Sequence, residues 1–320
     1  MTQPTHSTDR PIIAVVGPTA SSKSELGVEV ALRFNGEIIN CDSVQVYRGL
    51  YIGTAKVPPE ERRGVPHHLI DIVDPTEHFT AGAYAMLASQ TIEGIEARGK
   101  LAVLVGGTGF YLRALRAPLF DSPPTDLQLR RRLSQIVDRR GPEHIHRLLK
   151  RVDPNSAARI PIRDWARAIR ALEFYFQTGQ PMSQHLLLRP PSPPFASRLR
   201  LMALDSPREV LYQRINERTE RMFEQGWVGE VQRLLDAGVP ASAKAFGAHG
   251  YRRILQYLRG DITLERAIEL TKQDVRHYAK RQLTWFRREP QVTWFEGFGD
   301  DPSVQARVIA HILSLFLKSA

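Results

Sequence analysis

The stretch Gly17-Pro18-Thr19-Ala20-Ser21-Ser22-Lys23-Ser24 stands between an apolar run, residues 11–16, and a helix-like segment, residues 25–33. A turn that connects a buried strand to a helix directs several backbone N–H groups and the positive end of the helix dipole to one place, where an anion can bind. The stretch matches the pattern G-x-x-x-x-G-K-[ST], except that Ser22 replaces the second glycine. Its context predicts a phosphate-binding loop, and the competing interpretation is a serine-rich turn without a ligand.

Two side chains at the end of this loop suit a phosphorylated ligand. Lys23 adds a mobile positive charge, and Ser24 adds a hydroxyl that can reach a phosphate-bound Mg²⁺. We therefore expect the eight residues from Gly17 to Ser24 to bind phosphate groups. Ser24 would contact Mg²⁺ directly or through a water molecule.

Strand-like runs alternate with helical patterns in the first third of the chain. The runs cover residues 12–16, 37–40 and 101–105, and a long helical pattern covers residues 81–97. This alternation predicts an α/β fold with a parallel sheet and right-handed crossovers. In such sheets ligands bind at the carboxyl ends of the strands. We expect the phosphate loop, residues 41–43 and residues 106–109 to converge there on one site.

The composition changes after Pro118. The following residues are helical and rich in arginine up to a proline-rich stretch, residues 189–195, and a strand-like run, residues 199–204, then resumes the sheet. The sequence therefore predicts a P-loop parallel-sheet core flanked by helices, residues 1–117 and 198–320, and a mostly helical insertion domain, residues 118–197. Further helical patterns in the core cover residues 211–224, 230–237, 264–288 and 302–317.

The composition also limits the class of protein. The chain has 320 residues, of which 42% are hydrophobic, enough for one large domain or two ordinary ones. No apolar run approaches the ~18 residues of a membrane span, and residues 1–10 lack the apolar segment of a signal peptide, so we expect a cytoplasmic protein. The single cysteine, Cys41, excludes an internal disulfide, and we expect it to be a buried, reduced thiol.

The charge pattern favours a polyanionic partner. The net charge is +10, and arginines gather in two stretches, residues 130–170 and 276–288, where aromatic residues interleave with them. A guanidinium group binds phosphate through two hydrogen bonds, and aromatic rings stack on unpaired bases. These stretches are therefore more typical of nucleic-acid binding than of solvated helix faces alone.

Asp42 follows one of the strand-like runs at the sheet edge that carries the phosphate loop. It could hold Mg²⁺ through water, accept a proton or a hydrogen bond from an attacking nucleophile, or only cap the turn that contains Ser43. The next strand-like run ends in Gly106-Gly107-Thr108-Gly109 rather than in the aspartate that commonly follows such a strand in P-loop hydrolases. This difference weakens a nucleotide-hydrolase interpretation.

Several other residues allow more than one role. His67 and His68 are adjacent and have no obvious third partner, so a structural role is favoured over metal binding. Arg214 and Arg218 lie one helical turn apart and could together form a two-pronged anion clamp. Lys56 and Arg48 are either solvated or directed towards phosphate.

A series of motifs runs through the chain in a fixed order. The first are the phosphate loop, Asp42-Ser43-Val44-Gln45-Val46-Tyr47-Arg48-Gly49, Ile52-Gly53-Thr54-Ala55-Lys56, Pro66-His67-His68-Leu69-Ile70-Asp71 and Val105-Gly106-Gly107-Thr108-Gly109. The later ones are Arg167-Ala-Ile-Arg-Ala-Leu-Glu173, Thr178-Gly179, Arg214-Ile215 with Arg218, Gly250-Tyr251 and Lys280-Arg281-Gln282-Leu283-Thr284-Trp285. Together they resemble the tRNA dimethylallyltransferase family over nearly the whole chain.

This resemblance implies a reaction and the residues that perform it. The five-carbon dimethylallyl group of dimethylallyl diphosphate would pass to the exocyclic amine of the adenosine on the 3′ side of a tRNA anticodon. Lys23, Arg218 and Mg²⁺ would neutralise the leaving diphosphate, with Thr19 beside it, and Asp42 would take the amine proton. Asp42, Arg218 and Thr19 are thus the expected catalytic residues.

The resemblance also implies tRNA contacts and partners. The expected contacts are Asp42, Ser43, Val44, Gln45, Thr108, Arg130, Ala166, Arg167, Ala168, Ile169, Arg170, Lys280, Arg281, Gln282 and Arg287. The insertion domain would clasp the anticodon stem-loop as a helical lid. We expect a monomer that binds tRNA and dimethylallyl diphosphate but no membrane.

The chain departs from the family pattern at three places. Ser22 replaces a common glycine, Arg163-Asp164 stands where an Asn-Asp pair is common, and His249 lies between two glycines near a usual Ile-Gly-Tyr run. One alternative function is a P-loop kinase or ATPase that acts on a small molecule. Another is a tRNA-binding module without catalysis, which the presence of Lys23 and Asp42 disfavours.

Overall fold

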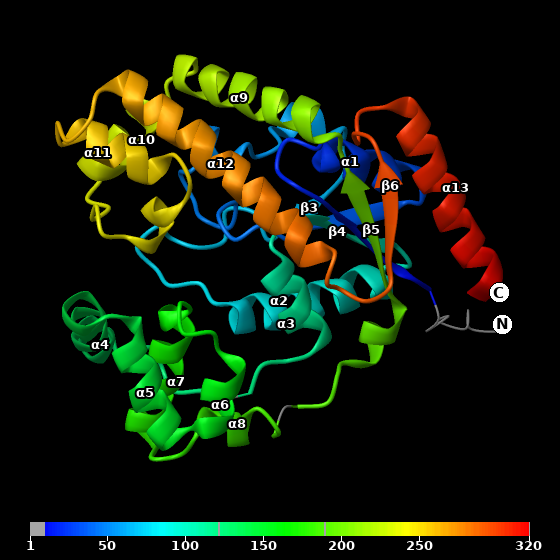
Figure 1. The fold of residues 1–320 in the computed structure, drawn as a ribbon. Coiled ribbons are helices and arrows are strands. Elements are labelled where there is room, and N and C mark those ends of the chain that lie inside the picture. The colour runs from blue at the N-terminus through cyan, green and yellow to red at the C-terminus, as the bar shows by residue number, and fades with distance from the viewer. Residues whose placement is uncertain (1–9, 121, 189, 320) are drawn as a thin grey trace. The chain divides into compact units, whose positions relative to one another are not determined.

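The computed structural model describes residues 10–120, 122–188 and 190–319; residues 1–9, where we expect no signal peptide, lie outside this part. Six parallel strands form one sheet in the order β3-β2-β4-β1-β5-β6 (Figure 1). The strands are β1 (Ile12–Val16), β2 (Gly36–Asn40), β3 (His67–His68), β4 (Leu101–Gly106), β5 (Leu199–Asp205) and β6 (Val292–Glu296). The predicted α/β fold with a parallel sheet is thereby confirmed.

The central strands are the ones that the sequence predicts best. Every residue of β1, β2 and β4 is buried, because strands in a parallel sheet are covered on both faces. The two edge strands were not predicted. β3 has only two residues, and β6 is mostly half-buried, so neither presents the continuous apolar run of an interior strand.

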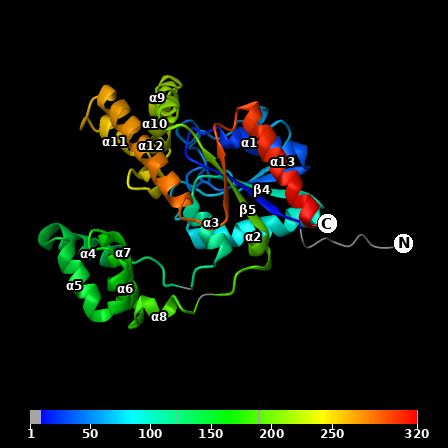
Figure 2. The ribbon, with the colours of Figure 1, turned by 45° about the vertical axis from the view of Figure 1, so that its right-hand side comes forward.

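Helices cover both faces of this sheet (Figures 1 and 2). Helices α1 (Lys23–Arg33) and α13 (Pro302–Ser319) pack on one face, where Leu26 and Val308 belong to the same apolar core. Helices α2 (Ala81–Ala97) and α3 (Gly109–Arg116) pack together on the other face. None of the helices in the described part of the chain is long and apolar enough to cross a membrane.

Four more helices lie between β5 and β6. They are α9 (Arg208–Glu224), α10 (Trp227–Asp236), α11 (Tyr251–Leu258) and α12 (Leu264–Phe286). Helices α9 and α12 run side by side, and α12 packs against α11 and α3 as well. This arrangement carries side chains from the last third of the sequence to the loops at the carboxyl ends of the strands.

The chain divides into two compact units, residues 1–116 with 193–320 and residues 117–192, whereas the sequence predicts the insertion at residues 118–197. The second unit contains α4 (Leu127–Arg140), α5 (Pro142–Val152), α6 (Pro154–Arg159), α7 (Trp165–Thr178) and α8 (Met182–His185). Its helices share an apolar core that includes Ile145, Leu149 and Leu172. Buried Asp153 accepts hydrogen bonds from the N–H groups of Ser156 and Ser183 and so connects α6 to α8.

Candidate active site

The phosphate loop leaves β1 and enters α1, which is the strand–loop–helix context that the motif requires. Ala20 and Ser22 have φ angles of 66° and 58°. Ser22 thus takes the left-handed conformation to which glycine is better suited, at a cost of about 1–3 kcal/mol. Hydrogen bonds hold this loop, since Ser21 Oγ donates to the Pro18 carbonyl at 2.8 Å and the Gly299 N–H donates to the Ser21 carbonyl at 2.9 Å.

Lys23 folds back over the loop, where its Nζ donates to the Pro18 carbonyl oxygen at 3.1 Å. Burial lowers the pKa of Lys23 to about 8, while the charge of Asp42 opposes this shift and the charge of Arg218 adds to it. Three charged side chains from α1, the segment after β2, and α9 therefore act on one another. An anion bound at the loop would favour the charged form of Lys23.

Arg218 reaches the loop from α9, where its Nη2 donates a hydrogen bond to Thr19 Oγ1. Burial lowers the pKa of Arg218 to about 10, so the guanidinium remains charged at neutral pH. Arg214, one turn before Arg218 on the same helix, reaches the loop as well, with its Nη1 3.3 Å from Ser22 Oγ, but it is also paired with Oδ2 of Asp300 at 2.8 Å. The two-pronged anion clamp of Arg214 and Arg218 stays a prediction.

Gln282 lies on helix α12 and connects the phosphate loop to the segment after β4. Its Oε1 accepts a hydrogen bond from the Thr19 N–H at 2.8 Å, and its Nε2 donates to the Gly107 carbonyl at 3.0 Å. The side chain is buried and both of its polar ends are occupied. The expected contact between Gln282 and tRNA is therefore corrected, because this side chain supports the phosphate loop instead.

Asp42 follows β2 with one carboxylate oxygen bound and the other open. Its Oδ1 accepts hydrogen bonds from the N–H groups of Val44 at 2.8 Å and Gln45 at 3.3 Å. Within the described residues Oδ2 accepts no hydrogen bond from the protein. Turn capping and proton acceptance, two alternatives in the sequence analysis, are thus compatible because they use different oxygens.

Thr108 joins the segment after β4 to the segment after β2. Its Oγ1 accepts a hydrogen bond from the Ser43 N–H at 3.0 Å, and its own N–H donates to the Cys41 carbonyl at 3.2 Å. Cys41 is buried, and burial raises the pKa of its thiol to about 12. The thiol is therefore protonated at neutral pH and is not a nucleophile.

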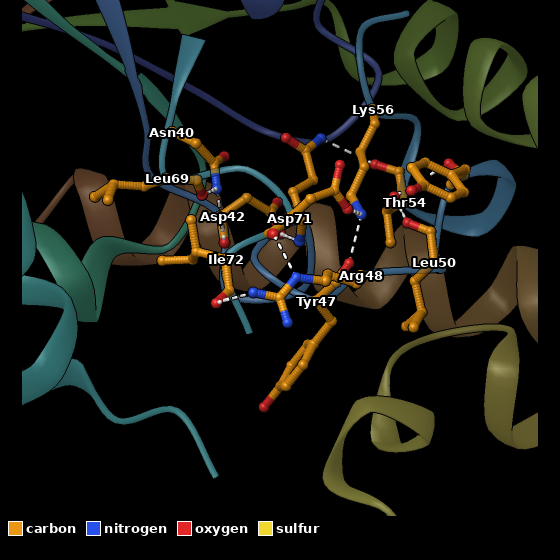
Figure 3. Close-up of polar contacts among 12 residues, drawn as sticks. Asn40, Asp42, Tyr47, Arg48, Leu50, Thr54, Lys56, Leu69, Asp71 and Ile72 are labelled. Atoms are coloured by element: carbon orange, nitrogen blue, oxygen red, sulfur yellow. Dashed lines mark hydrogen bonds and ion pairs between the residues drawn. The ribbon is translucent and has the colours of Figure 1, made fainter. Parts of the chain in front are cut away.

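The segment 42–56 closes on itself and on residues 69–73 (Figure 3). Gln45 Nε2 donates to the Thr54 carbonyl at 3.0 Å, and Asn40 Nδ2 donates to the Leu69 carbonyl at 2.9 Å. The buried carboxylate of Glu230 accepts hydrogen bonds from the N–H groups of Tyr51 at 2.8 Å and of residue 52 at 2.7 Å. Glu230 was not predicted from the sequence, because a carboxylate in a helix normally indicates an exposed position.

Ser24 lines a small hollow together with Asn40 and Gln45. The described residues contain no cluster of three His, Cys, Asp or Glu side chains that could hold a metal ion. His68 Nε2 lies 2.7 Å from Glu37 Oε2, and His67 Nδ1 lies 2.9 Å from the Val65 carbonyl. Both histidines therefore form hydrogen bonds at the edge of the sheet. A metal at this site would depend mainly on phosphate oxygens and water molecules as ligands.

In the second unit, two of the expected tRNA-binding arginines surround a buried carboxylate. Arg130 Nη2 lies 2.8 Å and Arg170 Nη1 lies 2.5 Å from Glu173 Oε2. Ala168 and Ile169 are buried in the core of this unit, so direct tRNA contact through their side chains is corrected. Other side chains of this unit remain exposed, namely Arg131, Arg132, Arg163, Trp165, Ala166 and Arg167.

The basic residues at the end of α12 differ in their contacts. Lys280 and Arg281 are exposed, and Arg281 Nη2 lies 3.4 Å from His249 Nε2. Arg287 is exposed too, with its Nη2 3.4 Å from Asp205 Oδ1. These three side chains can reach a polyanion, in contrast to Gln282 on the same helix.

The fold and the site together define a class of protein. A P-loop with a charged lysine and arginine can hold a diphosphate, and an open carboxylate oxygen stands at the same sheet edge. The chain is therefore a P-loop α/β protein whose site suits the transfer of a group away from a diphosphate.

Comparisons with known proteins identify the family. The IPP transferase family matches residues 45–289. A tRNA dimethylallyltransferase from Solibacter usitatus is 50% identical over 295 residues, which are 92% of this chain and 95% of that relative. The crystal structure of the tRNA isopentenylpyrophosphate transferase from Bacillus halodurans has a TM-score of 0.71 and 40% identity, covering 97% of this chain and 98% of the other.

A eukaryotic dimethylallyltransferase, whose structures show it acting on tRNA, superposes with a TM-score of 0.77 and 29% identity, covering 95% of this chain and 79% of the other. The chain belongs to the IPP transferase family, the tRNA dimethylallyltransferases.

Proposed function

We propose that this protein transfers the dimethylallyl group of dimethylallyl diphosphate to the exocyclic amine of the adenosine 3′-adjacent to a tRNA anticodon, and releases diphosphate. The main support is that an anion-binding loop and Asp42 lie at the same site, and that Oδ2 of Asp42 accepts no hydrogen bond from the described residues. Membership of the family supports the identity of both substrates. We expect the active protein to be a monomer and to work in the cytoplasm.

The reaction forms one bond and breaks one. The amine nitrogen of adenosine bonds to the allylic carbon, and the bond between that carbon and the diphosphate oxygen breaks. The nitrogen then carries an extra proton, which passes to Oδ2 of Asp42. Because the N–H groups of Val44 and Gln45 hold Oδ1, the carboxylate is fixed in orientation before the substrate arrives.

The departing diphosphate gains negative charge as the carbon–oxygen bond breaks. Lys23 and Arg218 would stabilise that charge together with the backbone N–H groups of the loop. Thr19 connects these groups, because its hydroxyl contacts Arg218 and its N–H is held by Gln282. Substrate binding would require Arg218 and Lys23 to exchange their present partners for phosphate oxygens.

The donor set fits Mg²⁺ bound to a diphosphate. Ser24 supplies a hydroxyl at the start of α1, and Mg²⁺ typically takes few protein ligands and keeps several waters. When bound, the ion would neutralise charge on the leaving group. Ser24 would hold it directly or through water.

We assign tRNA binding to the exposed basic side chains of both units. In the second unit these are Arg131, Arg132, Arg163 and Arg167, together with the exposed ring of Trp165, and in the first unit Lys280, Arg281 and Arg287. An arginine side chain binds phosphate groups, and an exposed aromatic ring stacks on an unpaired base. Ser43, Val44 and Thr108 are half-buried at the site and remain available to the adenosine.

One experiment tests the proposal against a kinase or ATPase. The protein is incubated with dimethylallyl diphosphate labelled in its five-carbon group, or with γ-labelled ATP, each with and without unmodified tRNA. We expect the five-carbon label to enter tRNA and the ATP label to stay in place. Transfer of the ATP label with no prenylation of tRNA would refute the proposal.

Two variants then test which substrate the phosphate loop binds. Lys23→Ala and Arg218→Ala should each raise KM for dimethylallyl diphosphate and slow the chemical step, because both lose charge beside the leaving group. The affinity for tRNA should change little. If both variants lost only tRNA affinity, the loop would bind the nucleic acid instead.

A further inference from the structure

Two residues beside the Asp42 turn have a strained backbone. Leu69 and Asp71 have φ angles of 60° and 55°, a left-handed conformation that is uncommon for residues other than glycine. Such a backbone conformation persists only where its surroundings hold it. The contacts that hold this segment therefore bear on the geometry of the site.

Lys56 makes the charged contact to this segment (Figure 3). Its Nζ lies 2.5 Å from Oδ1 of Asp71 and also donates to the carbonyl oxygen of Tyr47. Only 3% of the Lys56 side chain is exposed. Lys56 is therefore neither solvated nor free to bind phosphate, the two roles that the sequence left open.

The two partners of Lys56 lie on two segments that are already paired through their backbones. The N–H of Asp71 donates to the Gln45 carbonyl at 3.3 Å, and the N–H of Arg48 donates to the Val73 carbonyl at 2.9 Å. Lys56 adds a side-chain link across the same pair of segments. The contacts of Lys56 with Asp71 and Tyr47, together with these backbone hydrogen bonds, thus tie the strained residues to the turn that follows Asp42.

That turn holds Asp42 directly. The N–H of Tyr47 donates to the Val44 carbonyl at 3.1 Å, and the N–H groups of Val44 and Gln45 bind Oδ1 of Asp42. A shift of the Tyr47 carbonyl would therefore move the two N–H groups that orient the carboxylate. Lys56 restrains this carbonyl from a position that does not touch the reacting atoms.

We infer that Lys56, with Asp71, is a positioning residue that fixes the orientation of Asp42 for proton transfer. The inference rests on the proposed function, because it assigns a use to the base that function requires. It predicts that loss of the ion pair slows chemistry more than it weakens substrate binding. A misplacement of about 1 Å can cost on the order of 100-fold in rate.

The test substitutes Lys56→Met, which keeps a long unbranched side chain and removes the charged end. We expect the single-turnover rate of prenyl transfer to fall about 10- to 100-fold. KM for dimethylallyl diphosphate and the Kd for tRNA should each stay within about threefold. Asp71→Asn is a milder second variant, and the double variant should be no slower than Lys56→Met, because the two residues act as one pair.

Lys272→Met is the matched control, since Lys272 is also largely buried and ion-paired, with Glu220 and Glu269, but contacts neither segment. It should keep the wild-type rate. A normal rate in folded Lys56→Met, or in Asp71→Asn if the former does not fold, would overturn the inference. Loss of tRNA affinity with an unchanged rate would overturn it as well.

Parallel assays separate this inference from the function on which it rests. If the wild type transfers no label to tRNA, the proposed function fails. If Asp42→Ala keeps its rate, the assignment of the base fails. If the wild type is active, Asp42→Ala is slow and Lys56→Met is normal, only the positioning role fails.

Discussion

Replacing Gln282 by methionine should destabilise the protein and impair diphosphate use without a direct effect on tRNA contacts. Methionine has a similar length but cannot pair with the Thr19 N–H or the Gly107 carbonyl, which lie 2.8 Å and 3.0 Å from the amide. An unpaired buried polar group costs about 1–3 kcal/mol. Because Thr19 is only half-buried, we expect a total loss of about 2–4 kcal/mol in the free energy of unfolding.

Urea unfolding measures this loss as a lower midpoint at an unchanged slope. Gln273→Met, an exposed position on the same helix, is the control and should change the midpoint little. KM for dimethylallyl diphosphate should rise in Gln282→Met, because Thr19 loses its support, whereas the Kd for tRNA should stay near that of the wild type. A variant with normal stability and weak tRNA binding would refute this reasoning and restore Gln282 as a tRNA contact.

Three further predictions concern the base, the charge of the loop and the insertion. Asp42→Ala should lower the single-turnover rate about 10²- to 10⁴-fold while the Kd for tRNA changes little, and a near-normal rate would exclude Asp42 as the base. Since the pKa of Lys23 is lowered to about 8 in the free protein, Lys23 loses its charge as the pH rises through 8, so affinity for dimethylallyl diphosphate should decline above pH 8. Titration calorimetry in two buffers should then show proton uptake on binding, and Lys23→Arg should abolish it; equal affinity at pH 7 and 9 would contradict this. Replacing Arg131 and Arg132 by alanine should weaken tRNA binding and reduce its salt dependence by up to about one unit of slope per lost contact, and an unchanged slope would mean that both are only solvated.

The pH dependence of stability offers an independent check on the fold. Burial opposes ionisation of Glu37, but hydrogen bonds from Arg98, Lys100 and His68 outweigh it and lower the pKa of this carboxyl to about 2. The folded state therefore binds fewer protons than the unfolded state between about pH 4.3 and 2, and stability is lost as the pH falls through that window. Glu37→Gln should flatten the urea midpoint across this range, and an equally steep decline in the variant would contradict the assignment.

The local features of this protein follow from its sequence alone. The phosphate loop is recognisable because its residues are contiguous, and the apolar run before it and the helical pattern after it need no distant partner. The order of strands and helices then placed Asp42 and Thr108 at one edge, because parallel strands present their carboxyl ends together. Short apolar runs for the strands and helical patterns between them supplied this information.

Only the tertiary structure decided which side chains face the site. Gln282 and Thr19 are 263 residues apart, and Arg214 pairs with Asp300 from a distant loop as well as with Ser22 of the phosphate loop. Lysine and glutamate usually lie at the protein surface, yet the side chains of Lys56 and Glu230 are buried against backbone groups of residues 42–56. A pattern in sequence reports which residues are apolar and how they repeat, whereas the partner of a polar side chain depends on which distant element packs beside it.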